Sequence, residues 1–183
     1  MKRVILSLLL ACALATSGSQ SWAGAPPSIE VFFSPQGGCT DAVVKALDHA
    51  TNTVLVQAYS FTSAPIAKAL VDAHRRGVKV TVILDKSQRT ENYSEADFLL
   101  HADIPTFIDA RHAIAHNKIM VIDAQTVLTG SFNFTKAAEE NNAENLLVIH
   151  DPALAATYIA NWHLHERHSE PYAGKVQQSG NRR

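Results

Sequence analysis

Residues 115–135 (AHNKIMVIDAQTVLTGSFNFT) combine polar side chains with two apolar runs in one short stretch. The polar residues form the pattern His-x-Lys-x4-Asp-x6-Gly-Ser-x-Asn between His116 and Asn133. Lysine brings a positive charge and three hydrogen-bond donors, and serine and asparagine add neutral donors. A neutral histidine can attack phosphorus or exchange protons with an oxygen. These residue types suit phosphate oxygens whose charge grows during displacement, and they predict a phosphoryl-transfer site that needs no metal ion.

The spacing of these residues allows their side chains to meet. His116 and Lys118 are two residues apart at the start of an expected strand, so they point to the same face. Ser131 and Asn133 have the same spacing after a second expected strand. In an antiparallel hairpin the start of the first strand lies beside the end of the second, and Gly130 allows close backbone approach. The alternative is a hairpin with polar ends, because an isolated His-x-Lys is common, but the complete pattern favours the phosphate site.

The segments around this hairpin alternate between patterns typical of strands and of helices. The expected strands are 29–34, 53–59, 78–85, 105–108, 118–123, 126–129 and 143–150. The expected helices begin at Thr40, span 64–76, lie around 94–102, and run from Asp151 to about Arg167. Residues 86–92 are expected to form a polar loop. No internal repeat is present, and the alternation predicts one α/β domain with a mixed sheet.

The N-terminal residues predict export. Lys2 and Arg3 precede an apolar run at 4–15, and Ser21-Trp22-Ala23 fits a small-x-small cleavage site. The run is shorter than the roughly 20 residues of a spanning helix. A lipoprotein signal ending at Cys12 fits less well, because leucine is a poor match before Ala11. We therefore expect a signal peptide at 1–23, a domain at 24–173 and a disordered tail at 174–183, in a periplasmic or secreted protein without stable membrane insertion.

Charge and cysteine usage set further limits. Removal of 1–23 takes two of the 16 basic residues and leaves 14 against 17 acidic ones, a net charge of −3. This balance excludes a surface coated in positive charge but allows a local basic groove. The candidates for that groove are Lys86, Arg89, Arg111, His112 and Lys136. Cys39 would then be alone and cannot form a disulfide within the chain. It is expected to be a small buried side chain, with an intermolecular link as the alternative.

Other polar and aromatic clusters are expected to have simpler roles. His163, His165 and His168 suggest a metal site, but only the last two share a helical face and no obvious carboxylate completes the set. Packing or solvent exposure is therefore favoured for them. Trp162 and Tyr158, four residues apart, are expected in the core. The segment Tyr59-Ser60-Phe61 is a candidate substrate wall.

The sequence also resembles a known family. The stretch HNKIMVID…GSFNFT is similar to the His-Lys-Asp signature of the phospholipase D superfamily. The segments VFFSPQGG, QAYSFTSAPIAKALVDAHRRGVKVTVILD and TKAAEENNAENLLVIH resemble small bacterial Nuc-type endonucleases. The similarity extends from Ile29 to about Arg167. It implies a phospholipase D-like α/β/α sandwich with a mixed β-sheet and one signature per chain.

The resemblance also implies roles for individual residues and requires no cofactor. The implied site residues are His116, Lys118, Asp123, Ser131, Asn133 and Glu144. His116 would form a phosphohistidine, Lys118 would bind the phosphate, and the serine and asparagine would line its pocket. Asp123 would have a structural or electrostatic role. Glu144 would orient His116, because a carboxylate on one imidazole nitrogen raises the basicity of the other.

The single copy of the signature predicts a homodimer. Phosphoryl transfer through histidine needs a nucleophile on one side and an acid for the leaving oxygen on the other. His116-x-Lys118 is the one His-x-Lys in the sequence. Two copies of the chain around a two-fold axis would supply both histidines, as the resemblance also implies. One would attack while its mate protonates the leaving alcohol.

The expected function is a metal-independent phosphodiesterase that cuts DNA, with RNA as an alternative substrate, and has little sequence preference. A lipid phosphodiesterase is the first alternative, but no exposed amphipathic stretch supports membrane contact. A nucleic-acid-binding or uptake protein with incidental cleavage is the second. The intact His116, Lys118 and Asn133 count against it.

Overall fold

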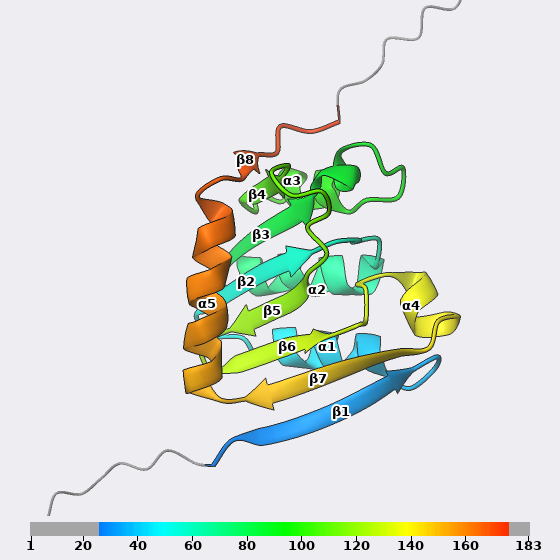
Figure 1. Ribbon diagram of the computed structural model, residues 1–183, viewed down its shortest axis with the longest axis vertical. Helices are drawn as coiled ribbons and strands as arrows, with labels where there is room; N and C mark the ends of the chain where they lie inside the picture. The colour runs from blue at the N-terminus through cyan, green and yellow to red at the C-terminus, as the bar shows by residue number, and fades with distance from the viewer. Residues whose placement is uncertain (1–25, 176–183) are drawn as a thin grey trace, which may run out of the picture.

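One mixed β-sheet carries helices on both of its faces (Figure 1). The computed structural model describes residues 26–175. The expected signal peptide at 1–23 and all but the first two residues of the expected tail at 174–183 therefore lie outside the described residues. None of the helices within 26–175 has the length and apolar character that crossing a bilayer requires. The predicted α/β fold with a mixed sheet is confirmed.

The sheet contains eight strands within the described residues. They are β1 Ser28–Ser34, β2 Thr53–Ala58, β3 Lys79–Asp85, β4 Thr106–Asp109, β5 Lys118–Ile122, β6 Thr126–Gly130, β7 Glu144–His150 and β8 Glu170–Pro171. Their order is β1-β7-β6-β5-β2-β3-β4-β8. The pairs β2–β3 and β3–β4 are parallel, and all other neighbours are antiparallel.

The helices form two layers around this sheet. They are α1 Cys39–Asp48, α2 Ala64–Arg75, α3 Ala96–His101, α4 Lys136–Glu140 and α5 Pro152–Glu166, with a 3-10 helix, η1, at Lys86–Arg89. The main core lies between the sheet and α1, α2 and α3. On the opposite face, α5 packs alone across the strands (Figure 1). Every residue of β5 is buried between these layers, as a central strand requires.

Local signals explain where several elements begin. The Asp151 carboxylate accepts hydrogen bonds from the backbone N–H groups of Ala153 and Leu154, and Pro152 occupies the first turn of α5. The short helix α4 begins in the same way, because the Thr135 hydroxyl accepts from the Ala138 N–H at 3.1 Å.

The structure corrects three details of the expected elements. Residues 86–92 are not a loop throughout, because η1 forms at their start, where the Asp85 carboxylate accepts from the Ser87 N–H. The helix expected around 94–102 is shorter than expected, because α3 spans only Ala96–His101. The elements α4 and β8 were not expected at all, because five and two residues are too few to show a periodic pattern.

Two buried side chains were predicted correctly. Cys39 is fully buried at the start of α1, and burial, with a further effect of the Glu139 charge, raises the pKa of its thiol to about 11. Trp162 is buried between α5 and the sheet, where its indole N–H donates to the Val56 carbonyl at 2.9 Å. Tyr158 packs against the same cluster.

Candidate active site

Strand pairing brings most of the expected site residues to one edge of the sheet. Antiparallel pairing of β5 with β6 sets Ile119 opposite Thr129, so the start of β5 lies beside the end of β6. On the other side of β6, Gly130 pairs with Leu146 near the start of β7. A pocket of about 360 Å³ opens there. It is lined by His116, Lys118, Gly130, Ser131, Asn133 and Glu144.

The two residues of the His-x-Lys motif are in direct contact. Lys118 Nζ lies 3.0 Å from His116 Nδ1 and donates to the His116 carbonyl at 2.7 Å. An ammonium group only donates, so Nδ1 accepts in this contact and a neutral ring carries its hydrogen on Nε2. The His116 side chain is exposed at the pocket, whereas Lys118 is 7% exposed.

Burial makes the Lys118 ammonium a strong candidate for anion binding. Loss of hydration lowers the pKa of Lys118, and the charge of Glu144 partly opposes this effect. The ammonium also lies 5.1 Å from the centroid of the Tyr59 ring, which is a cation–π distance. A bound phosphate would replace part of the lost hydration with charge-assisted hydrogen bonds.

Tyr59 supports the motif from the neighbouring strand. Its N–H donates to the Asn117 carbonyl at 2.8 Å, and its ring centroid lies 4.5 Å from that of His116. Tyr59, the first residue of the candidate substrate wall 59–61, therefore borders the site. Phe61 does not, because it is fully buried and packs edge-on against Phe134. The contact of Tyr59 with His116 was not predicted, although Tyr59 directly follows β2, the strand paired with β5.

Ser131 and Asn133 enter the pocket from the segment after β6. The Ser131 hydroxyl oxygen accepts from the Asn145 backbone N–H at 3.0 Å, which leaves its own hydrogen available to a ligand. Asn133 Oδ1 is buried and has no hydrogen-bond partner within the described residues. A buried amide atom without a partner is uncommon away from ligand sites. These two side chains can therefore bind a polar group in the pocket.

Asp123 lies at the other end of β5, away from this pocket. Its carboxylate accepts hydrogen bonds from the backbone N–H groups of Thr51, Asn52 and Thr53, and a fourth from the Thr51 hydroxyl, at 2.7–2.9 Å. Burial alone would raise the pKa of Asp123, but these hydrogen bonds together lower it. Asp123 thus fastens the start of β2 to the end of β5.

Glu144 lies in the pocket but does not bond His116 in this structure. Its carboxylate accepts from the Asn142 side-chain amide at 3.2 Å. The expected orienting contact would need the Glu144 side chain or the His116 ring to turn. The charge of Glu144 nevertheless acts on the pocket, because it stabilises the protonated form of Lys118.

The candidate groove residues are mostly engaged elsewhere. Arg89 pairs with Glu170, and Lys136 Nζ lies 3.6 Å from Glu140. Lys86 donates to the His112 carbonyl at 3.0 Å. These contacts do not support a continuous basic groove made of the five candidates.

Comparison with known proteins identifies the family. Residues 43–163 match the family described as cardiolipin synthase, PLD-like domain. A phospholipase D of Rickettsia felis is 42% identical over 134 residues, which cover 73% of this chain and 67% of the relative. A mitochondrial cardiolipin hydrolase of Mus musculus is 31% identical over 165 residues, covering 75% of each chain.

Solved structures agree with this assignment. The structure of Nuc from Salmonella typhimurium, a phospholipase D family member, matches with a TM-score of 0.77 and 40% identity, covering 80% of this chain and 98% of Nuc. NucT from Helicobacter pylori shares the fold, with a TM-score of 0.75 and 24% identity over 80% of this chain and 99% of NucT. The family match at residues 43–163 includes the hairpin that carries the pocket. The chain therefore belongs to the phospholipase D superfamily of phosphodiesterases.

Proposed function

We propose that this protein is an exported endonuclease that cleaves DNA, with RNA as an alternative substrate, through a phosphohistidine at His116 and without a catalytic metal ion. One observation carries the proposal: an exposed imidazole lies 3.0 Å from a buried ammonium inside a pocket with free hydrogen-bonding groups. The likeness to Nuc, at 40% identity over nearly the whole of that chain, supports the same branch of the family.

In the first step, His116 attacks the scissile phosphorus. The phosphate oxygens accept hydrogen bonds from the Lys118 ammonium, the Ser131 hydroxyl and the side-chain NH2 of Asn133, which stabilise the charge that develops on them. When the Lys118 amino group turns to the phosphate, it releases His116 Nδ1. Glu144 can then accept a hydrogen bond from a ring that carries its hydrogen on Nδ1, which leaves Nε2 free to attack.

The reaction has two steps, formation of the phosphohistidine and its hydrolysis. A phosphorus–nitrogen bond forms while the phosphorus–oxygen bond to the leaving alcohol breaks, and a second, protonated histidine gives its proton to that oxygen. The second histidine, now neutral, takes a proton from water, which attacks phosphorus. The phosphorus–nitrogen bond breaks and the enzyme returns to its starting state.

The second histidine is proposed to be His116 of a partner copy. Among the described residues, no other histidine lines the pocket. A row of exposed apolar side chains, Ile29, Val31 and Phe33, follows one face of the edge strand β1. Phe33 pairs in register with Asn145, whose amide contacts Ser131, so this row reaches the pocket. It would provide an apolar surface for a partner beside the site.

A lipid phosphodiesterase remains the second candidate. The relatives from Rickettsia felis and Mus musculus carry the names phospholipase D and mitochondrial cardiolipin hydrolase. Both candidates would use the same pocket and the same nucleophile. They differ in the substrate that reaches it.

The decisive experiment compares substrates in excess EDTA. The purified mature protein is incubated with plasmid DNA, with RNA, and with vesicles of phosphatidylcholine or cardiolipin, beside His116→Ala. The exposed His101, at the end of α3, provides the matched control His101→Ala. DNA cleavage that persists in EDTA, survives in the control and disappears in His116→Ala supports the nuclease. Lipid turnover without DNA cleavage supports the second candidate, and DNA retention without hydrolysis would indicate a binding protein.

Rapid quenching with denaturant at basic pH during turnover tests the covalent step. A phosphohistidine is acid-labile and base-stable, so a phosphorylated adduct of the chain should be recovered under basic conditions. The adduct should map to the peptide that contains His116 and should be absent from His116→Ala. Cleavage without any adduct on that peptide would argue for direct attack by water.

A further inference from the structure

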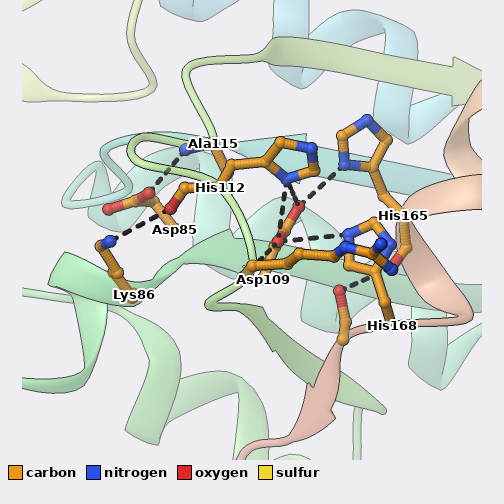
Figure 2. Close-up of polar contacts among 9 residues, drawn as sticks. Asp85, Lys86, Asp109, His112, Ala115, His165 and His168 are labelled. Atoms are coloured by element: carbon orange, nitrogen blue, oxygen red, sulfur yellow. Dashed lines mark hydrogen bonds and ion pairs between the residues drawn. The ribbon is translucent and has the colours of Figure 1, made fainter.

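Three histidines surround one fully buried aspartate at a second place in the fold. Asp109, which is 0% exposed, ends β4, and His112 follows it in the next loop. His165 lies in the last turn of α5, and His168 comes just after that helix. Figure 2 shows the three imidazoles directed at the Asp109 carboxylate from the loop and from the end of α5.

The distances in this cluster are short. His165 Nδ1 lies 2.8 Å from Asp109 Oδ2, and His112 Nδ1 lies 3.0 Å from the same oxygen. His168 Nε2 is 3.3 Å from Asp109 Oδ1. One ring nitrogen of each histidine and one carboxylate oxygen all lie within 4.8 Å of one another. The three ring centroids are 4.9–5.4 Å apart.

Hydrogen bonds alone do not account well for this arrangement. His168 Nε2 is buried, yet it makes no hydrogen bond within the described residues. Asp109 Oδ1 already accepts the Arg111 N–H at 3.1 Å. Three imidazole nitrogens around one fully buried carboxylate are a cluster of donor atoms that a cation can bind.

We propose that Asp109, His112, His165 and His168 form a tetrahedral binding site for Zn²⁺. Three imidazole nitrogens and one carboxylate oxygen are a donor set that zinc accepts, and four protein ligands without a water are typical of structural sites. Bonds of about 2.0–2.1 Å place tetrahedral ligand atoms roughly 3.3–3.4 Å apart, so the widest separation in the cluster must shorten by about 1.5 Å at most. The histidine–aspartate contacts of 2.8 Å and 3.0 Å must lengthen slightly. His112 can move for this contraction, because its side chain is 44% exposed and lies on a loop.

The place of this zinc site in the fold suggests what the ion does. Zinc would join β4 and its following loop to the end of α5, which otherwise meets the sheet through apolar packing and the Trp162–Val56 hydrogen bond. The same loop leads to His116. Two contacts already fasten it to the end of β3: the Ala115 N–H donates to Asp85 Oδ2 at 2.7 Å, and Lys86 donates to the His112 carbonyl (Figure 2). The bound ion would stabilise this corner of the molecule and take no part in the reaction.

The zinc site is separate from the proposed nuclease. None of its four residues lines the pocket of His116 and Lys118. Zinc binding should therefore persist in His116→Ala, and cleavage should persist at low temperature after zinc is removed. Failure of either proposal leaves the other intact.

The test measures zinc on the full mature chain. Protein freed of metal by EDTA and dialysis is titrated with Zn²⁺ by calorimetry, and its metal content is determined after gel filtration. We expect one Zn²⁺ per chain and, at a free concentration of about 100 Kd, a stabilisation of about 2.7 kcal/mol seen as a rise in Tm. Absence of stoichiometric binding, or binding without any change in Tm, would overturn the proposal.

Variants on one helix provide a matched comparison. His165→Ala and His112→Ala should each remove most of the bound zinc. His163→Ala should keep it, because His163 lies on the same helix but contacts Glu166 at 2.8 Å instead. Equal loss of zinc in all three variants would contradict the assigned ligands.

Cobalt substitution covers the case in which a variant does not fold. Wild-type protein loaded with Co²⁺ should show the intense visible absorption of a tetrahedral ion, and Zn²⁺ should displace it. The weak spectrum of six-coordinate Co²⁺ would exclude the proposed geometry.

Discussion

His116 and Lys118, two residues apart at the start of β5, contact each other through Nδ1 and Nζ at 3.0 Å. The ammonium is buried and the imidazole is exposed. A phosphate that binds the Lys118 ammonium would therefore weaken the hydrogen bond between Lys118 Nζ and Nδ1 of His116, the proposed nucleophile. Under the proposed mechanism, this contact would link substrate binding to activation of His116.

Lys118→Met should separate activity from stability. Loss of the ammonium removes the main positive charge from the pocket, so kcat/KM should fall by about 10²-fold to 10³-fold, as for loss of a group that stabilises transition-state charge. Burial costs the ammonium hydration, as its lowered pKa indicates, so an apolar side chain of similar length should leave Tm unchanged or raise it. Kinetics and thermal unfolding of the same preparation test both expectations. A large fall in both Tm and activity would indicate that Lys118 has a structural role instead.

Asp123→Asn should affect stability rather than catalysis. The amide cannot accept all four hydrogen bonds of the carboxylate, so the free energy of unfolding at pH 7 should fall by about 1–3 kcal/mol. The pKa of Asp123 is lowered in the folded state, so its stabilisation is complete above the ordinary value of 3.8 and is lost as pH falls through the folded value. The difference in Tm from wild type should thus shrink in acid. Asp48→Asn, at an exposed position on α1, is the control.

The local part of the site was predictable from sequence, whereas its surroundings were not. His116, Lys118, Ser131 and Asn133 share one hairpin, so strand periodicity alone brings them together. The placement of β1 beside β7, with Ser28 opposite His150, joins residues from the two ends of the domain and leaves no local signal. The catalytic roles themselves stay predictions.

The cluster of Asp109 with three histidines was also not predictable, because its members lie far apart in the sequence. His165 and His168 were visible as a pair on a helical face. Their carboxylate partner, Asp109, lies 56 positions from His165 in the sequence. Only the pairing of β4 with β3 and the packing of α5 on the sheet bring them together, and no spacing rule covers that separation.

Gly130→Ala should damage both the fold and the site. A Cβ atom at this position would lie 2.3 Å from the Asn145 carbonyl oxygen, and φ is +150°. The backbone of Asn145 also holds Ser131, so a shift would reach the pocket. We expect a loss of more than about 2 kcal/mol in unfolding free energy and a matching loss of activity. Gly77→Ala has positive φ but free space around the new Cβ, and should cost about 1 kcal/mol with activity retained.

Phe33→Asp should weaken the proposed dimer. Phe33 is 65% exposed on β1 and pairs with Asn145 beside the pocket. A charge in an apolar interface would be desolvated without a partner, so the protein should shift toward monomer in sedimentation velocity and lose activity in parallel. The exposed Phe98 on α3 provides the control Phe98→Asp, which should remain dimeric and active. Monomeric Phe33→Asp with full activity would contradict the shared site.

Mixed dimers offer the most direct test of a site built from two chains. If each reaction needs His116 from both copies, a dimer with one His116→Ala chain is inactive. Random exchange of wild-type and variant chains in equal amounts leaves about one quarter of the dimers fully wild type, so total activity should fall to about half of that of the wild-type chains alone. Independent sites would keep all of that activity, because every wild-type chain would work whatever its partner. The His101→Ala protein, mixed in the same way, controls for the exchange procedure. The two outcomes differ by a factor of about two in total activity. Adding increasing amounts of variant to a fixed amount of wild-type protein distinguishes them, because a shared site predicts progressive inhibition as variant is added.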